Sequence, residues 1–210
     1  MIELIGLNPT RSNRVQWILE ELDLPYRFRQ VNFKAGDTHS PAFLALNPNG
    51  KIPVLRDGDL VIYESAAIAN YLAETYGDGR LMPALGTPER AHYHQWLIYA
   101  VSELEQPLWT AAKHKFALPE ALRVDGLKPA VKFEFDRAFN ILADWLKGRE
   151  FMIGQNFSCV DVFITHTLGW AQKAGMDMDA PHVAEYVGRM TARPAFSRIA
   201  QKESEPFNPA

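Results

Sequence analysis

The pattern of apolar residues changes after residue 77, and this change limits the possible fold more than any other feature of the sequence. Before it, helical segments alternate with short β-like runs at 2–5, 26–33, 52–55 and 60–63. After it, the apolar residues recur with a helical period. A chain of 210 residues is long enough to form two cores. The sequence therefore predicts an α/β domain followed by an all-helical one.

The first domain is predicted to have the element order βαβαββα. Its first helix carries an apolar stripe at i, i+3, i+4 and i+7, formed by Val15, Ile18, Leu19 and Leu22. Two further helices are expected around 41–46 and over Ser65–Tyr76. The last two strands are joined through Asp57-Gly58, a hairpin signal in which both turn positions favour positive φ.

Glycine and proline residues between 78 and 88 predict a linker, so the expected domains are 1–77 and 89–210. The second domain shows three stripes at helical spacing. Their members are Tyr93, Trp96, Leu97, Ala100 and Leu104; Phe135, Ala138, Phe139, Leu142 and Leu146; and Val183, Tyr186, Val187 and Met190. Between the last two stripes, Ser158 and Asp161 form a capping-box pattern that predicts a helix start.

Composition excludes several classes of function. The net charge is -3 and no block of Lys or Arg occurs, so nucleic acid is not expected as a partner. No apolar run approaches the ~18 residues of a membrane span and no secretory signal is visible, so we expect a cytoplasmic protein without a membrane partner. Cys159 is the single cysteine, and the six histidines lack ligand spacing, so no metal is expected. Any sulfur chemistry must use the thiol of another molecule.

One motif combines a proline in a strand with the start of a helix. Pro53 removes a backbone donor from a β-like run, which predicts a cis bond to Ile52 at the start of a strand. The backbone of Ile52 is then available to pair with an extended peptide. Ser65 at a helix start suits a carboxylate, and Glu64 suits an ammonium group. A proline turn and an ordinary N-cap would give the same pattern.

Taken together, these features resemble the cytosolic glutathione S-transferase family. The resemblance rests on the βαβαββα order, the Pro-x-Gly-Lys-Ile-Pro-Val-Leu run with Glu-Ser after the hairpin, and the late capping box. It implies an α+β protein with a thioredoxin-like N-terminal domain and an all-α helical bundle. It also implies glutathione as cosubstrate, and a homodimer.

Carried over from the family's motif, the residues that would bind glutathione are His39, Lys51, Ile52, Pro53, Glu64 and Ser65. Ile52 would bond the cysteinyl backbone, with Pro53 as the cis proline. Glu64 and Ser65 would hold the γ-glutamyl end. Lys51 and His39 would approach the glycine carboxylate, although His39 also fits a solvated loop histidine.

The position that would stabilise the thiolate departs from the family's usual pattern. Family members carry Tyr, Ser or Cys in the loop after the first strand, and this sequence resembles members whose helix opens Ser-Arg-Ser, with Thr10 at the first serine. The serine position of several other classes falls on Pro9, which cannot donate. Thr10 is therefore the first candidate, with Ser12 and Asn8 as alternatives and Arg11 as an electrostatic helper. Thr10 and Ser12 would otherwise only cap the helix.

An electrophile pocket is expected between the domains, lined by Tyr93, Trp96, Tyr99, Ala100 and Trp109. Trp96 also belongs to an apolar stripe and so fits a core position, whereas Tyr99 lies to one side of that stripe. The implied activity is a glutathione transferase that conjugates reduced glutathione to small hydrophobic electrophiles. Two alternatives remain: glutathione-dependent reduction of peroxides or disulfides, and a non-catalytic binding module, as in the elongation factor 1 gamma subunit and the stringent starvation proteins.

Overall fold

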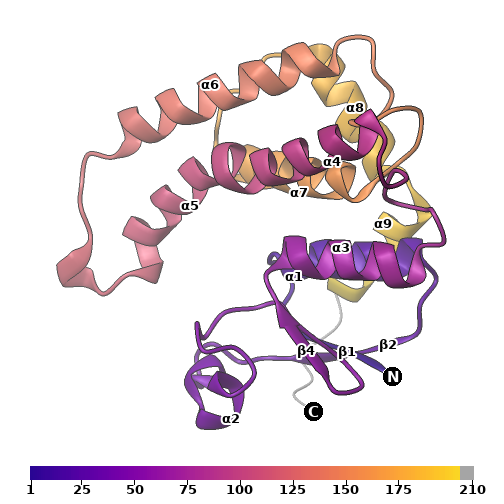
Figure 1. Cartoon of the computed structure of the whole chain (residues 1–210). Helices are drawn as coiled ribbons and strands as arrows, with labels where there is room; N and C mark the ends of the chain where they lie inside the picture. Colours follow the sequence, from indigo (N-terminus) through magenta and orange to yellow (C-terminus); the bar gives the residue numbers. More distant parts are fainter. Residues whose placement is uncertain (204–210) are drawn as a thin grey trace. The chain divides into compact units, whose positions relative to one another are not determined.

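A computed structural model describes residues 1–203, and the chain divides by packing into two compact units (Figure 1). One unit contains Met1–Met82 together with Thr191 and the described residues that follow it. The other contains Pro83–Met190. This grouping differs from the expected domains 1–77 and 89–210, because the last helix packs with the first unit.

The first unit is built on a four-stranded mixed sheet. Its strands are β1 (Ile2–Gly6), β2 (Tyr26–Gln30), β3 (Val54–Asp57) and β4 (Leu60–Tyr63), in the spatial order β2-β1-β3-β4. β1 and β2 are parallel, while β3 is antiparallel to β1 and to β4. Helices α1 (Ser12–Glu21) and α3 (Ser65–Tyr76) cover one face, and α2 (Pro41–Leu44) lies on the other (Figure 1). The predicted thioredoxin-like order is confirmed.

Three local predictions differ from the structure. β3 begins at Val54 rather than at Ile52, because Pro53 has no N–H to donate to a ladder. β2 ends at Gln30 rather than at 33, where the chain turns so that Asp37 accepts a 2.7 Å hydrogen bond from the Asn32 N–H. Only the first residue of the Gly58-Asp59 turn has positive φ, +58°, which is typical of a type II′ turn.

Helix α9 (Pro194–Glu203) packs on α1 within the first unit. Arg193 forms a bidentate ion pair with Glu21 at 2.7 Å for each bond. Glu20 accepts from Arg198 at 2.7 Å and is also paired with Lys202. The hydrogen bonds that Lys202 and Arg198 donate keep the pKa of the Glu20 carboxyl below its usual value, against the opposing effect of burial.

The second unit contains helices joined by loops and has no β-strand among its described residues, as predicted. Its helices are α4 (Pro88–Tyr99), α5 (Gln106–Ala112), α6 (Lys128–Leu146), α7 (Cys159–Lys173) and α8 (Pro181–Thr191), whose last residue is grouped with the first unit. It also has π-helical turns at Ala100–Leu104 and Lys113–Ala117 and a 3-10 turn at Glu120–Leu122. The three predicted stripes form its core, with Val187 only half-buried. No helix within residues 1–203 has the length and apolarity needed to cross a membrane.

Candidate functional site

Three chain segments meet at one end of the sheet. Ile5 near the end of β1 pairs with Val54 at the start of β3, and Val54 pairs with Tyr63 at the end of β4. The loop after β1, the residues before β3 and the residues after β4 must therefore lie at the same end of the sheet. Leu7 and Ile52 both pack against the apolar cluster around Val54. The register thus brings together residues that are far apart in the sequence.

The Ile52–Pro53 peptide bond is cis, as the sequence predicted. Because β3 starts only at Val54, Ile52 lies outside the ladder. Within residues 1–203, no hydrogen bond engages the backbone of Ile52. Its backbone N–H and C=O are therefore available to an added extended peptide.

The loop before Ile52 is held by Asn47, which sequence reasoning missed. Its buried amide donates to the Lys51 carbonyl at 2.8 Å and accepts from the Asn49 N–H at 3.0 Å. This is an Asx turn, and the Asn-Pro-Asn-Gly run was the available signal. Asn47 therefore holds the Lys51 carbonyl in place, immediately before the backbone of Ile52 that is available for pairing.

His39 lies against the same loop. Gly50 has φ +60°, and a Cβ built there would be 3.1 Å from the Thr38 carbonyl and 3.3 Å from the His39 ring. Only glycine fits this approach without strain. The structure therefore brings exposed His39 beside the loop that carries exposed Lys51.

The start of α3 has polar side chains that are available to a bound molecule. Ser65 is the first helical residue and not the N-cap, and no hydrogen bond within the described chain uses its hydroxyl. The N-cap position is held by Glu64 with φ 71° and ψ 112°, a sparsely populated conformation that costs about 1–3 kcal/mol. The first turn contains no acidic residue. The exposed Glu64 carboxylate and the Ser65 hydroxyl suit an ammonium and a carboxylate group, respectively.

Thr10, in the loop between β1 and α1, makes hydrogen bonds within that loop. Its hydroxyl lies 2.5 Å from the Leu7 carbonyl and 3.1 Å from the Ser12 hydroxyl, and it accepts from the Ser12 N–H at 3.1 Å. Because a hydroxyl has one proton, the short contact with Leu7 makes that carbonyl its main acceptor. Thr10 thus bonds the first N–H of α1 from the loop before the helix, and its hydroxyl proton can be redirected to another acceptor.

Two neighbours support Thr10. Ser12 is fully buried and accepts from the Leu7 N–H at 3.3 Å, so its hydroxyl is directed into the loop. A side chain at Gly6 would approach the Ser12 Oγ to 2.3 Å, so only glycine is compatible with this packing. Asn13, which sequence reasoning missed, accepts from the Thr10 N–H at 3.0 Å.

The other two candidates in this loop flank Thr10. Arg11 is half-buried and occupies the N-cap position of α1 without a side-chain capping bond. Asn8 precedes a second cis proline, Pro9, and within the described chain its enclosed amide has no hydrogen-bond partner. Both residues lie at the same end of the sheet as Ile52.

The residues expected to line an electrophile pocket belong to the helical unit. Tyr93, Trp96 and Ala100 are buried in its core, as expected from their stripe. Tyr99 donates to the Ala138 carbonyl at 3.2 Å, and burial raises the pKa of its hydroxyl. Trp109 is half-buried. Their role toward an electrophile stays a prediction.

The chain's own thiol is not reactive. Cys159 is fully buried, and this burial raises the pKa of its thiol to about 12. Among residues 1–203, no three His, Cys, Asp or Glu side chains form a set that could hold a metal ion. A nucleophilic sulfur at the same end of the sheet as Ile52 would therefore have to come from a bound molecule.

Family models match both parts of the chain. Residues 3–74 match the model described as "Glutathione S-transferase, N-terminal domain", and residues 106–194 match "Glutathione S-transferase, C-terminal domain". The Glutathione S-transferase GstB of Escherichia coli K12 is 31% identical over 95% of this chain and 97% of its own length. The Disulfide-bond oxidoreductase YfcG of the same strain is 29% identical over 96% of this chain and 95% of its own.

Solved structures agree with this match. The glutathione transferase URE2P6 from Phanerochaete chrysosporium, in complex with oxidized glutathione, has a TM-score of 0.87 and 26% identity over 97% of this chain and 96% of its own. A glutathione transferase family member from Pseudomonas fluorescens, with two glutathione molecules bound, has a TM-score of 0.81 and 28% identity over 94% of this chain and 91% of its own.

Proposed function

Because the chain belongs to the glutathione S-transferase family, we propose that it binds reduced glutathione at this end of the sheet and joins the glutathione sulfur to small hydrophobic electrophiles. The proposal rests on two groups at this end of the sheet that a bound peptide could use. An open backbone at Ile52 lies at the same end of the sheet as a helix start with a free hydroxyl at Ser65. A peptide with an amino-acid terminus complements both.

Glutathione would lie at this end of the sheet as an added strand. Its cysteinyl N–H and C=O would pair with the backbone of Ile52 beside cis Pro53. Its γ-glutamyl carboxylate would accept from Ser65 at the start of α3, with its ammonium group near Glu64. Its glycine carboxylate would extend toward the loop that holds Lys51 and His39.

Thr10 would then stabilise the thiolate. Its proton is bonded to the Leu7 carbonyl, and a hydrogen bond to an anion is roughly twice as strong as one to a neutral acceptor. A thiolate beside α1 would therefore attract this proton away from Leu7. Ser12, which is buried and bonded inward, would hold Thr10 in place rather than contact the sulfur.

The energies are sufficient without a general base. A thiol with a pKa of about 8.5 is only a few per cent ionised at neutral pH. Lowering that pKa by about two units requires about 2.7 kcal/mol. One hydrogen bond to the anion contributes about 1.5–3 kcal/mol and the α1 terminus about 0.3–1 kcal/mol. The thiolate then forms a bond to the electrophilic carbon as the leaving group departs with its electron pair.

Calorimetry tests the binding site. Ser65→Ala removes the hydroxyl, which should leave the γ-glutamyl carboxylate with one partner fewer and weaken glutathione binding by about 1.5–3 kcal/mol. Ser102→Ala, at an exposed serine of the helical unit, is the matched control and should bind as the wild type does. Equal dissociation constants for Ser65→Ala and the wild type would contradict the proposed site.

Disulfide reduction is the second candidate, supported by the similarity to YfcG. In that reaction two glutathione molecules are oxidised to their disulfide while the substrate disulfide is reduced to two thiols. The same thiolate would attack a substrate sulfur instead of a carbon. A panel of electrophiles, peroxides and small disulfides, each assayed with glutathione, separates the two activities.

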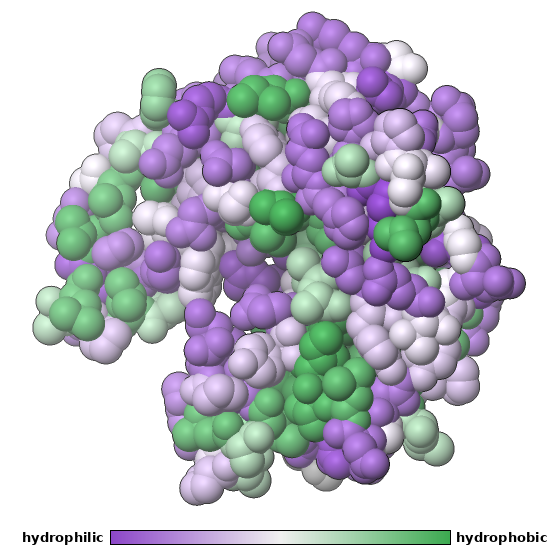
Figure 2. Space-filling model, viewed as in Figure 1, coloured by the Kyte–Doolittle hydropathy of each residue, from purple (hydrophilic) through white to green (hydrophobic). Residues whose placement is uncertain are grey.

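We also propose a homodimer. β4 is an edge strand of the sheet, and Figure 2 shows hydrophobic residues gathered over it. Two residues of this strand, Leu60 and Val61, are 40% and 36% exposed. An exposed sheet edge is a template for pairing with another chain, and an exposed apolar patch marks an interaction site. Sedimentation at micromolar concentration should show a dimer that Val61→Lys weakens and Val124→Lys, at an exposed valine of the helical unit, does not. A single species near 23.8 kDa would refute the dimer.

A further inference from the structure

A cavity of about 430 Å³ lies on the α2 face of the sheet. It is lined by Arg29, Gln30, Val31, Asp37, Ser40, Ala42, Phe43, Leu46 and Arg56. This volume is within the range of small-molecule sites, about 300–1,000 Å³. The cavity belongs to the first unit alone, and none of its lining residues is used in the proposed glutathione site.

Its charge follows from the strand register. Glu3 on β1 pairs with Arg27 on β2 and with Arg56 on β3, so the three side chains form one row across this face. Arg29 is two residues beyond Arg27 and projects from the same face. One carboxylate is therefore shared by three guanidinium groups, which gives this row an excess of two positive charges. Asp37, which also lines the cavity, reduces the excess around the cavity to one.

The three arginines are not satisfied by that carboxylate. Their nitrogens lie 3.9 Å (Arg27), 3.8 Å (Arg29) and 3.7 Å (Arg56) from Glu3, beyond hydrogen-bonding distance. Within the described chain, the enclosed Nε of Arg29 has no hydrogen-bond partner. Enclosed polar groups are normally bonded, so this donor points to an acceptor that the chain does not supply.

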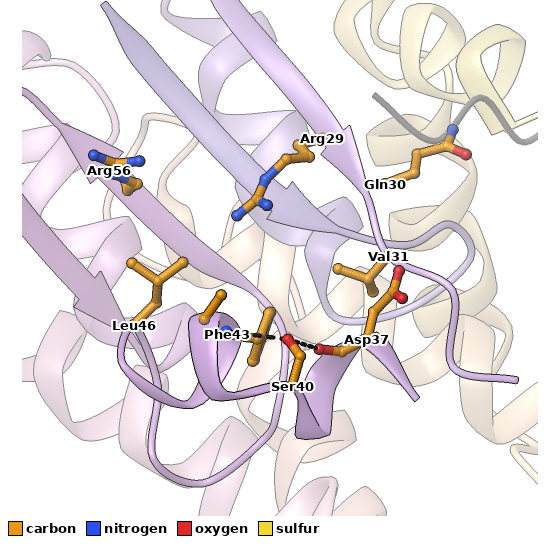
Figure 3. Close-up of a pocket in the computed structure, with 9 residues that line it drawn as sticks. Arg29, Gln30, Val31, Asp37, Ser40, Phe43, Leu46 and Arg56 are labelled. Carbon is orange, nitrogen blue, oxygen red and sulfur yellow. Dashed lines mark hydrogen bonds between the residues drawn. The ribbon is translucent and has the colours of Figure 1, made fainter. Parts of the chain in front are cut away.

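The opposite wall of the cavity is apolar. Val31 and Phe43 are buried there, with Leu46 packed against them. Figure 3 shows Arg29 and Arg56 on one side of the cavity and these apolar side chains on the other. Asp37 lies on the apolar side, where its carboxylate accepts a hydrogen bond from the Asn32 N–H. Its negative charge disfavours an anionic group at that end of the cavity.

We propose that this cavity binds a small organic anion: a carboxylate or sulfonate on an apolar body. The acid group lies between Arg29 and Arg56, where guanidinium forks match its geometry. The body covers Val31, Phe43 and Leu46. The separation of the cationic side from the apolar side fixes the orientation of the ligand.

Fluorine NMR titration with 4-(trifluoromethyl)benzoate tests the site. The wild type should bind the probe saturably, and saturating glutathione should not displace it. Arg29→Gln and Arg56→Gln should each weaken binding about tenfold or more, because each removes a charged hydrogen-bond donor. The neutral 4-(trifluoromethyl)benzamide should bind at least about tenfold more weakly than the benzoate for the same reason.

Arg27→Gln is the matched control, because Arg27 faces the same carboxylate but does not line the cavity. It should change the affinity less than about twofold, as for a screened surface charge. Ala42→Trp, at an exposed residue that lines the cavity, should abolish binding by filling the space. Wild-type affinity in Arg29→Gln and Arg56→Gln, equal losses in Arg27→Gln, or displacement by glutathione would each overturn the proposal.

Discussion

A similar hydrogen-bonded arrangement stands at the start of α1 and of α7, with Ser158 as the N-cap of α7 and Thr10 one residue before Arg11, the N-cap of α1. In each, a hydroxyl residue is followed three positions later by a polar acceptor that bonds back to its N–H. The Thr10 N–H donates to Asn13 at 3.0 Å, and the Ser158 N–H donates to Asp161 at 2.8 Å. The two starts differ in charge, because the acceptor is a neutral amide in α1 and a carboxyl group in α7.

The α7 start is closed. Asp161 is fully buried and accepts from the Met152 N–H, the Ser158 N–H and hydroxyl and the Tyr186 hydroxyl, all at 2.8–2.9 Å. Burial raises the pKa of this carboxyl, and the four hydrogen bonds oppose that effect. Its donors and acceptors are matched to one another, so this helix start serves the fold.

The α1 start is open. Its first turn contains no acidic residue, so the positive end of the helix dipole is not compensated by the chain itself. Thr10 is only half-buried, and its proton is bonded to a neutral carbonyl. The comparison teaches that the charge of the acceptor matters: the Asp161 carboxyl is bonded within the fold, whereas the neutral Asn13 amide leaves the α1 terminus suited to the anion that we propose for it.

The largest expected effect is on stability at α7. Asp161→Ala leaves several buried donors without an acceptor and should lower the free energy of unfolding by about 3–5 kcal/mol. Asn13→Ala, the corresponding change at α1, should cost only about 1 kcal/mol, as for a single cap. Equilibrium urea unfolding of both variants measures the difference. Equal losses would remove the distinction between the two helix starts.

The next effect is on the thiol at α1. Thr10→Ala should raise the pKa of the bound glutathione thiol by about one to two units, corresponding to a lost hydrogen bond of about 1.5–3 kcal/mol. Turnover should fall while glutathione affinity changes little, because the hydroxyl distinguishes thiolate from thiol. Thiolate absorbance against pH measures the shift in protein saturated with glutathione.

Thr10→Ser keeps the hydroxyl and should titrate close to the wild type. Ser12→Ala tests whether Ser12 only positions Thr10, in which case its shift should be the smaller one. Superimposable titrations for the wild type and Thr10→Ala would move the role to Ser12, Asn8 or the backbone near Arg11.

The smallest effect comes from making α1 resemble α7. Asn13→Asp places a carboxylate in the first turn and should compete with the thiolate for the helix terminus. The expected rise in the bound thiol pKa is about 0.2–0.7 unit, from a dipole interaction of about 0.3–1 kcal/mol. Asn140→Asp adds the same charge at an exposed position on α6 and is the control. A thiol pKa in Asn13→Asp that is equal to or below the wild-type value would show that the α1 terminus does not act on the sulfur.

Elements with local signals could be predicted from the sequence. β4 and α3 have the predicted bounds, because a glycine turn precedes the first and Glu64-Ser65 separates the two. The capping box at Ser158 and Asp161 is present as predicted. Such signals act over a few residues, so they can be recognised without knowledge of the rest of the chain.

The assignment of the last helix could not be predicted. Helix α9 was not among the predicted helices, and no local pattern indicates the core against which it packs. The structure decides this through Trp17 and Phe196, whose ring centroids are 4.8 Å apart, and through the ion pair of Arg193 with Glu21. Those contacts join residues more than 170 positions apart, and no local pattern indicates them.

The candidate site divides in the same way. The sequence by itself determined which residue types are present: a proline that leaves Ile52 outside a ladder, Ser65 at a helix start, and Thr10 in the loop after the first strand. Only the tertiary structure decided that strand register brings these segments to one end of the sheet, that Ser12 is buried, and that the Thr10 hydroxyl donates to the Leu7 carbonyl. The physical reason is range: capping and turn preferences act between neighbours, whereas register and burial depend on contacts between distant parts of the chain.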